Sequence, residues 1–96
     1  MSRRTHRVED LLRAELSTLI LRRMNDPRVK LASISGVEVS PDLRHARVLL
    51  SALGEEHERQ DCLAALKHAR GFLRSQLARG LRHMKNIPEL AFELDE

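Results

Sequence analysis

The chain has 96 residues, of which 42% are hydrophobic and 32% are charged, and this composition is typical of one globular domain with a single core. Its one cysteine, Cys62, excludes an internal disulfide and a cysteine-rich metal framework. No apolar run approaches the roughly 20 residues of a membrane span, and no secretory signal is visible. We therefore expect a soluble cytoplasmic protein that forms a single domain over residues 1–96, with residues 1–5 flexible.

The net charge of +3 is unevenly distributed along the chain. Residues 1–30 contain eight basic and four acidic residues, and residues 65–85 contain six basic residues and no acidic one. The segments between and after them are acidic, with three basic against six acidic residues in 31–64 and four acidic residues in 86–96. Such alternation indicates that one face of the protein binds a polyanion.

The first predicted element is a helix from Arg4 to Met24, because apolar residues recur along it every three or four positions. Asn25–Pro27 ends this helix, since proline cannot continue it and restricts the residue before it. Residues 33–40 have the apolar pattern of a strand in which Gly36 marks a bulge. After turn residues, the alternation in residues 46–53 predicts a second strand, so that the two strands form a hairpin.

Gly54–Glu56 closes the hairpin and starts the next helix, with acids near its positive end. Helical periodicity runs from Asp61 to about Lys85, and its interruption at Ala69–Gly71 predicts a kink between two helices. Pro88 ends this stretch, and the alternation of residues 90–94 predicts a third strand. The order is therefore helix, strand, strand, helix, helix, strand. We predict an α+β fold in which a three-stranded sheet has its helices on one face.

This order is the type II KH arrangement, and three segments of the chain resemble the bacterial ribosome-binding factor A family. Ser40–Val48 resembles the hairpin turn and second strand of that family. Ala69–Leu77 resembles its kinked helix pair, in which an Ala-x-Gly bend replaces the glycine loop of other KH domains. Pro88–Asp95 resembles the final strand, and Asp26–Arg28 after the first helix also agrees. The resemblance extends over essentially the whole chain.

The resemblance implies a non-enzymatic factor that binds the immature small ribosomal subunit. It further implies contact with ribosomal RNA near the decoding region during late maturation, a part in rRNA processing, and importance in the cold. We expect a monomer with no cofactor, no small-molecule substrate and no membrane partner. The sequence stops at Glu96, where family members often continue into a flexible tail, so we expect that any function of that tail is absent or that the tail was removed.

The second helical stretch contains the main candidate site. Its periodicity places five basic residues along one flank of its apolar face: Lys67, Arg70, Arg74, Arg82 and Lys85. Surface helices usually mix charges of both signs, whereas no acidic residue occurs between Asp61 and Glu89. We therefore predict that these residues bind RNA phosphates, in preference to the alternative of an ordinary solvated helix surface.

Two further basic clusters are weaker candidates. Arg3, Arg4 and Arg7 form a second predicted RNA contact, with a frayed and solvated terminus as the alternative. RNA contact is a weaker prediction for the basic residues around the end of the first helix, because the helix dipole by itself already favours cations there. These residues are Arg22, Arg23, Arg28 and Lys30.

The glycines indicate how RNA is recognised. They stand at positions 36, 54, 71 and 80, so no pair has the Gly-x-x-Gly spacing with which KH domains clamp single strands. Because Trp and Tyr are also absent, we expect recognition through phosphates, 2′-hydroxyls and RNA shape, with little stacking on bases. Close packing of helix on sheet is a second explanation of Gly71.

Catalytic and metal-binding motifs are not apparent in the sequence. The five histidines lack the spacing of common metal sites, Cys62 lies on an apolar helix face, and neither a nucleophile elbow nor a P-loop is present. Two functions of other classes remain as alternatives to ribosome assembly. One is a protein-interaction module whose basic face docks an acidic partner, and the other is a DNA-binding domain.

Overall fold

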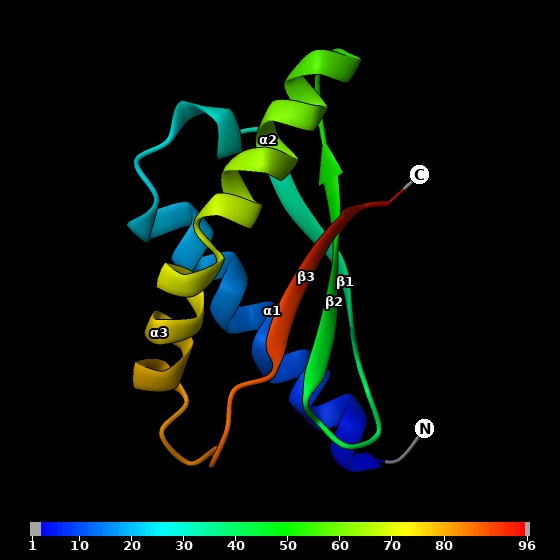
Figure 1. Cartoon of the computed structure of the whole chain (residues 1–96), viewed down its shortest axis with the longest axis vertical. Helices are drawn as coiled ribbons and strands as arrows, with labels where there is room; N and C mark the ends of the chain where they lie inside the picture. The colour runs from blue at the N-terminus through cyan, green and yellow to red at the C-terminus, as the bar shows by residue number, and fades with distance from the viewer. Residues whose placement is uncertain (1–2, 96) are drawn as a thin grey trace.

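The computed structural model describes residues 3–95, and its helices and strands occur in the predicted order. The bounds of the elements are α1 (Arg3–Arg23), the 3-10 turn η1 (Pro27–Val29), β1 (Ala32–Val39), β2 (His45–Ala52), α2 (Glu56–His68), α3 (Arg70–Gly80) and β3 (Glu89–Leu94). The strands form one sheet in the order β1-β2-β3, and the three helices cover one of its faces (Figure 1). The predicted α+β, type II KH-like fold is confirmed.

The sheet is mixed, since β1 and β2 are antiparallel whereas β2 and β3 are parallel. The register of β1 on β2 shifts between Ile34 and Gly36, which confirms the bulge predicted at Gly36. Ile34 and Val37 are three residues apart and would face opposite sides of a regular strand. Because the bulge inserts one extra residue, both side chains are buried in the same core.

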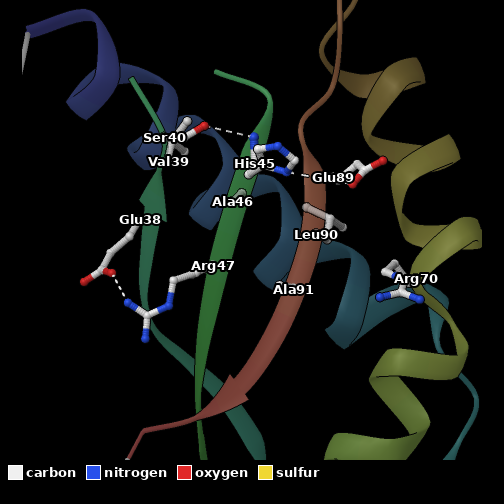
Figure 2. Close-up of a pocket in the computed structure, with 10 residues that line it drawn as sticks. All are labelled: Glu38, Val39, Ser40, His45, Ala46, Arg47, Arg70, Glu89, Leu90 and Ala91. Atoms are coloured by element: carbon white, nitrogen blue, oxygen red, sulfur yellow. Dashed lines mark hydrogen bonds and ion pairs between the residues drawn. The ribbon is translucent and has the colours of Figure 1, made fainter. Parts of the chain in front are cut away.

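The open face of the sheet carries a network of ion pairs across all three strands. Arg47 of β2 contacts Glu38 of β1 at 2.6 Å (Figure 2). The same guanidinium donates to the carboxylate of Glu93 on β3 at 2.8 and 3.0 Å. These hydrogen bonds lower the pKa of Glu93, so the carboxylate stays ionised and the charge of Arg47 is neutralised on this face.

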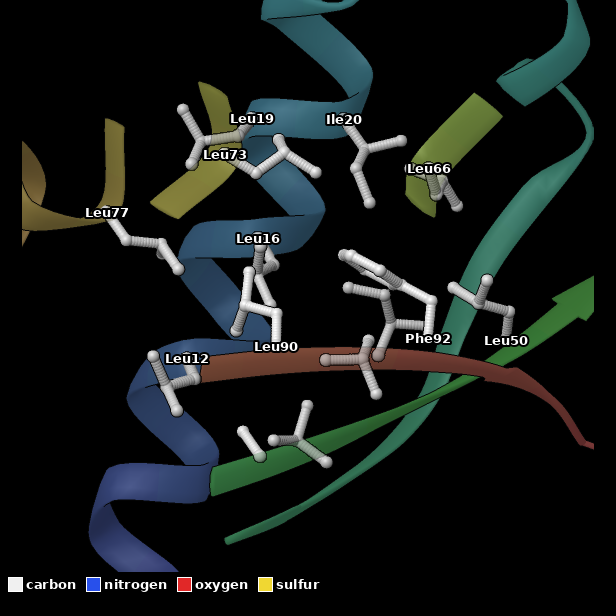
Figure 3. Packing of buried hydrophobic residues seen from close by; sticks show 14 of the residues in the cluster. Leu12, Leu16, Leu19, Ile20, Leu50, Leu66, Leu73, Leu77, Leu90 and Phe92 are labelled. Atoms are coloured by element: carbon white, nitrogen blue, oxygen red, sulfur yellow. The ribbon is translucent and has the colours of Figure 1, made fainter. Parts of the chain in front are cut away.

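The core lies between the sheet and the helices, and Figure 3 shows leucines of α1 and α3 packed over the side chains of β3. Leu12 and Leu16 of α1 are fully buried, as are Leu73 and Leu77 of α3. Phe92 is 2% exposed and lies on the strand side of this cluster. Burial of these side chains removes apolar area from water and fixes how the helices lie on the sheet.

The second helical stretch differs from the prediction at its C-terminal end. α2 begins at Glu56, in the segment predicted to start the helix, and a capping box satisfies its first turn: the Glu55 N–H donates to Glu58 Oε1 at 3.0 Å. Between α2 and α3, Ala69 leaves the helical conformation with ψ near 4°, which confirms the predicted kink. α3 then ends at Gly80, because Leu81 takes φ −118° and ψ 56°.

The predicted continuation of the helix to Lys85 is therefore wrong. Residues 81–88 form a loop whose apolar side chains Leu81, Ile87 and Pro88 are buried. Leu81 and Met84 keep the helical spacing in the sequence, but they anchor a loop on the core.

The flexibility expected for residues 1–5 stays a prediction. Arg3 to Thr5 form the first turn of α1 with Thr5 buried, and residues 1 and 2 lie outside the described part of the chain.

Candidate nucleic-acid interface

The start of α1, the β1–β2 turn and the α3–β3 loop lie at one end of the molecule (Figure 1). Residues of these segments line an open groove of about 1390 Å³. Six cationic side chains from these segments and from α3 line it: Arg3, Arg4, Arg7, Arg44, Arg74 and Lys85. We call this surface the basic groove. Two histidines, His45 and His83, and two acids, Asp42 and Glu89, also line it.

α1 supplies three arginines to the basic groove from its first two turns. Arg3, Arg4 and Arg7 are spaced by three and four residues, so they lie on one side of the helix, while Thr5 and Val8 are buried and fix its rotation. The positive end of the helix dipole favours acids, yet this first turn contains none. Helix stability therefore does not explain these arginines, whereas binding of an anion does.

Arg74 connects the helical side of the groove to its loop. Its Nε and Nη2 atoms donate to the carbonyl oxygen of Ile87 at 3.2 and 2.9 Å. A carbonyl does not neutralise the guanidinium charge, and three of its five N–H donors remain for another acceptor. Because Ile87 is itself buried, this bond holds the loop that carries Lys85 against α3.

The β1–β2 turn holds Arg44 at the rim of the groove. Asp42 accepts hydrogen bonds from the Ser40 hydroxyl at 2.6 Å and from the Arg44 backbone N–H at 3.0 Å. These bonds lower the pKa of Asp42, and the nearby charges of His45 and Arg44 add smaller contributions. The other acid of the groove, Glu89, lies 3.8 Å from His45. Across residues 3–95, none of the six cations of the basic groove forms an ion pair.

The basic groove joins two sites that were predicted separately. It brings the N-terminal cluster Arg3, Arg4 and Arg7 together with Arg74 and Lys85 of the second helical stretch. Arg44 was not among the predicted site residues, because it stands in a segment with more acids than bases and only the fold brings it to the groove. The turn residues Pro41 and Asp42 were the only signal in the sequence that Arg44 lies at an exposed turn.

The predicted single basic stripe is wrong as a piece of helix geometry. Lys67 belongs to α2, before the bend, and Arg82 and Lys85 belong to the loop after α3. Only Arg70 and Arg74, four residues apart, share one side of α3. The stripe fails because Ala69 and Leu81 both leave the helical conformation.

Arg70, Lys67 and Arg82 lie outside the basic groove. Arg70 borders a smaller hollow of about 590 Å³ over the ends of the strands, whose lining also includes Glu38 and Glu89 (Figure 2). Lys67 is close enough to Glu93 to add to the lowering of its pKa, after the larger effect of the Arg47 hydrogen bond. Arg82 is exposed and lines neither hollow.

Gly71 lies next to the bend and is exposed. No heavy atom lies within 4 Å of the position that a Cβ would take there, so close packing of helix on sheet does not explain this glycine. Ala69, by contrast, is half-buried against the core at the break itself. The predicted kink therefore has its structural break at Ala69 and leaves uncovered backbone at Gly71.

Two other residues singled out by the sequence have structural roles. Arg28 is bound to the carboxylate of Asp26 at 2.6 Å, and this pairing lowers the pKa of Asp26 to about 2. Its charge is therefore taken up within the loop after α1. Cys62 is buried as predicted, and burial raises the pKa of its thiol, which keeps it protonated.

The described residues contain no group of three histidine, cysteine or acidic side chains placed to hold a metal ion. None of the helices between residues 3 and 95 combines the length and the apolar character needed to cross a membrane.

Comparison with known proteins gives a family match over nearly the whole chain. The family model described as ribosome-binding factor A matches residues 4–96. The chain belongs to the ribosome-binding factor A family. The family member from Solibacter usitatus (strain Ellin6076) is 46% identical over 94 residues, which cover 98% of this chain and 76% of that protein.

Solved structures of the family agree with the fold. The crystal structure of ribosome-binding factor A from Thermus thermophilus has a TM-score of 0.81 and 30% identity, and 94% of each chain is covered. A homology model of the Thermus thermophilus protein, fitted into a cryo-EM map of a complex with the 30S subunit, has a TM-score of 0.75 and 32% identity. That match covers 91% of this chain and 90% of the other.

Membership in the ribosome-binding factor A family confirms the resemblance stated from Ser40–Val48, Ala69–Leu77 and Pro88–Asp95. The family is named for ribosome binding, not for a reaction.

Proposed function

We propose that this chain binds the small ribosomal subunit by placing the basic groove on folded ribosomal RNA. The observation that carries the proposal is the meeting of six cations from separate segments around one open groove, with no ion pair to any of them in residues 3–95. Unneutralised cations repel one another, so their assembly in the fold costs stability unless an anion is bound.

Phosphate recognition explains the mixture of side chains in the groove. Arginine can bind two phosphate oxygens at once, and lysine adds a mobile point charge. The rim presents cations from a helix end, a turn and a loop, and contacts to phosphates and 2′-hydroxyls do not depend on base identity. We therefore expect the groove to recognise RNA by its shape and charge.

The small subunit is proposed as the binding partner because of a homologue in the family. A homologue 32% identical to this chain has been fitted into the map of a complex with the 30S subunit. The proposal extends to contact near the decoding region, to late maturation with rRNA processing, and to growth in the cold, as the family resemblance implies. In this account the chain acts in the cytoplasm as a monomer without catalysis, cofactor or small-molecule substrate.

The predicted contacts outside the groove remain part of the proposal as secondary ones. Arg70 and the bend at Ala69–Gly71 lie beside the groove residue Arg74 on α3, so RNA seated in the groove can extend along them. Lys67 and Arg82 would then meet RNA only at the periphery.

Sedimentation of the tagged protein tests this proposal. We expect it to travel with free small subunits on a gradient of cell extract and to be absent from polysomes. Nuclease treatment should release it, because RNA supplies the contact, and structured RNA should compete far better than duplex DNA at equal salt. Association that survives nuclease would favour docking on a protein, and equal competition by DNA would favour a DNA-binding domain; either outcome contradicts the proposal.

A further inference from the structure

The outward side of α3 is a second uncovered surface, distinct from the basic groove. Leu73 and Leu77 occupy the buried side of this helix. Apart from Arg70, Arg74 and Gly80, the exposed residues of this helix are Gly71, Phe72, Ser75, Ala78 and Arg79. α3 lies at the outer side of the helical layer, away from the strands (Figure 1).

Phe72 is the unusual residue on this surface. The chain has two aromatic residues; Phe92 is buried in the core at 2% exposure, whereas Phe72 is 46% exposed. Two of its neighbours on the helix surface are small, since Gly71 has only open space beside it and Ser75 follows one turn later. An aromatic ring is therefore accessible to a flat partner at the first turn after the bend.

Arg79 places a cation on the same side of α3. It follows Phe72 by seven residues, so the two lie on nearly the same side of the helix, roughly 10 Å apart along its axis. Helical side chains lean toward the N-terminus, which brings the guanidinium back toward the ring. Arg79 has no ion pair within residues 3–95, and no acidic residue occurs in the sequence between Asp61 and Glu89.

We infer that Phe72 is a stacking platform for one unpaired RNA base, with Arg79 binding an adjacent phosphate. A nucleotide fits this surface because it combines a planar apolar group with a negative charge, as the surface combines a ring with an unpaired cation. An apolar protein partner would use the ring but gain nothing from the Arg79 cation. The inference rests on the proposed RNA binding. It adds one stacked base to the recognition that the sequence predicted, in which stacking on bases plays little part.

The experiment compares two RNA probes. One is a blunt 12-base-pair RNA duplex, and the other is the same duplex with a 3′ overhang of four adenosines. Base stacking on an aromatic side chain is worth enough that Phe72→Leu should weaken binding of the overhang probe roughly tenfold. Binding of the blunt duplex should be unchanged, because the basic groove is intact. Phe72→Tyr keeps a ring and should bind both probes like the unmodified chain.

Each other outcome has a defined meaning. If Phe72→Leu binds the overhang probe as well as the unmodified chain does, Phe72 is no stacking platform and the proposed function stands. If this variant binds both probes equally more weakly, the ring supports the fold and the inference is overturned. If it binds both probes normally but no longer binds small subunits, the ring contacts a protein and the inference is likewise overturned. If the unmodified chain binds neither probe, the proposed function itself fails. Thermal unfolding of each variant checks the fold.

Discussion

The open face of the sheet and the basic groove both present exposed arginines, and they differ in what surrounds them. Arg47 lies between Glu38 and Glu93, on neighbouring strands, so its charge is satisfied within the protein. The cations of the groove come from a helix end, a turn, α3 and a loop, and the two acids there have other partners. For the binding of an anion, the number of cations on a surface therefore matters less than whether carboxylates lie close enough to neutralise them.

The largest expected effect comes from reversing charges in the basic groove. Arg4→Glu combined with Lys85→Glu alters both rims, and acid at the start of α1 is favourable for the helix dipole, so the fold should persist. We expect affinity for structured RNA to fall at least about tenfold and the slope of log affinity against log salt to fall by about 2. Fluorescence anisotropy at several salt concentrations measures both.

A matched control separates the groove from net charge. Arg13→Glu with Arg59→Glu makes the same change in net charge on α1 and α2, outside the groove and outside the predicted basic clusters. This variant should lose less than about threefold in affinity and keep nearly the full salt slope. Equal losses in the two double variants would show that RNA responds to overall charge, and the groove would lose its special role.

The smallest expected effect is on the open face of the sheet and concerns stability. The Arg47 hydrogen bonds lower the pKa of Glu93 in the folded chain. Their stabilisation is therefore fully present above the ordinary glutamate pKa of about 4.3 and is lost as the pH falls through the lower folded value. Arg47→Gln should reduce this acid-dependent loss slightly, because both groups are exposed, while RNA affinity stays unchanged.

Thermal unfolding between pH 2 and 6 compares the acid dependence of stability in Arg47→Gln with that in the unmodified chain. An acid dependence identical in Arg47→Gln and the unmodified chain would mean that the ion pairs of the sheet contribute nothing to stability. Weaker RNA binding by this variant would place part of the RNA interface on the open face of the sheet, contrary to the assignment of RNA binding to the groove.

Much of the fold follows from local patterns in the sequence. The apolar period located α1, and the mismatch in phase between Ile34 and Val37 indicated the bulge that the register confirms. The end of α3 could not be predicted in this way, because Leu81 and Met84 continue the helical spacing while packing a loop on the core. A periodic pattern reports which residues face the core, not whether the backbone between them stays helical.

The candidate site was less accessible to sequence reasoning. Basic clusters at both ends of the chain were visible, but their meeting depends on how α1 and the loop after α3 reach the same end of the sheet. Arg44 joins them from a segment that is acidic on average. Charge patterns along a chain therefore identify the components of an interface, and the fold decides which components are combined.

Chemical-shift mapping tests the central claim most directly. A ¹⁵N-labelled sample is titrated with structured RNA at fixed salt, and the backbone amides that respond are located. We predict the largest changes at Arg3–Arg7, at Arg44 and in the loop around Lys85, with little change along the strands that carry Glu38, Arg47 and Glu93. Changes centred on those strands, with the groove residues unaffected, would contradict the account.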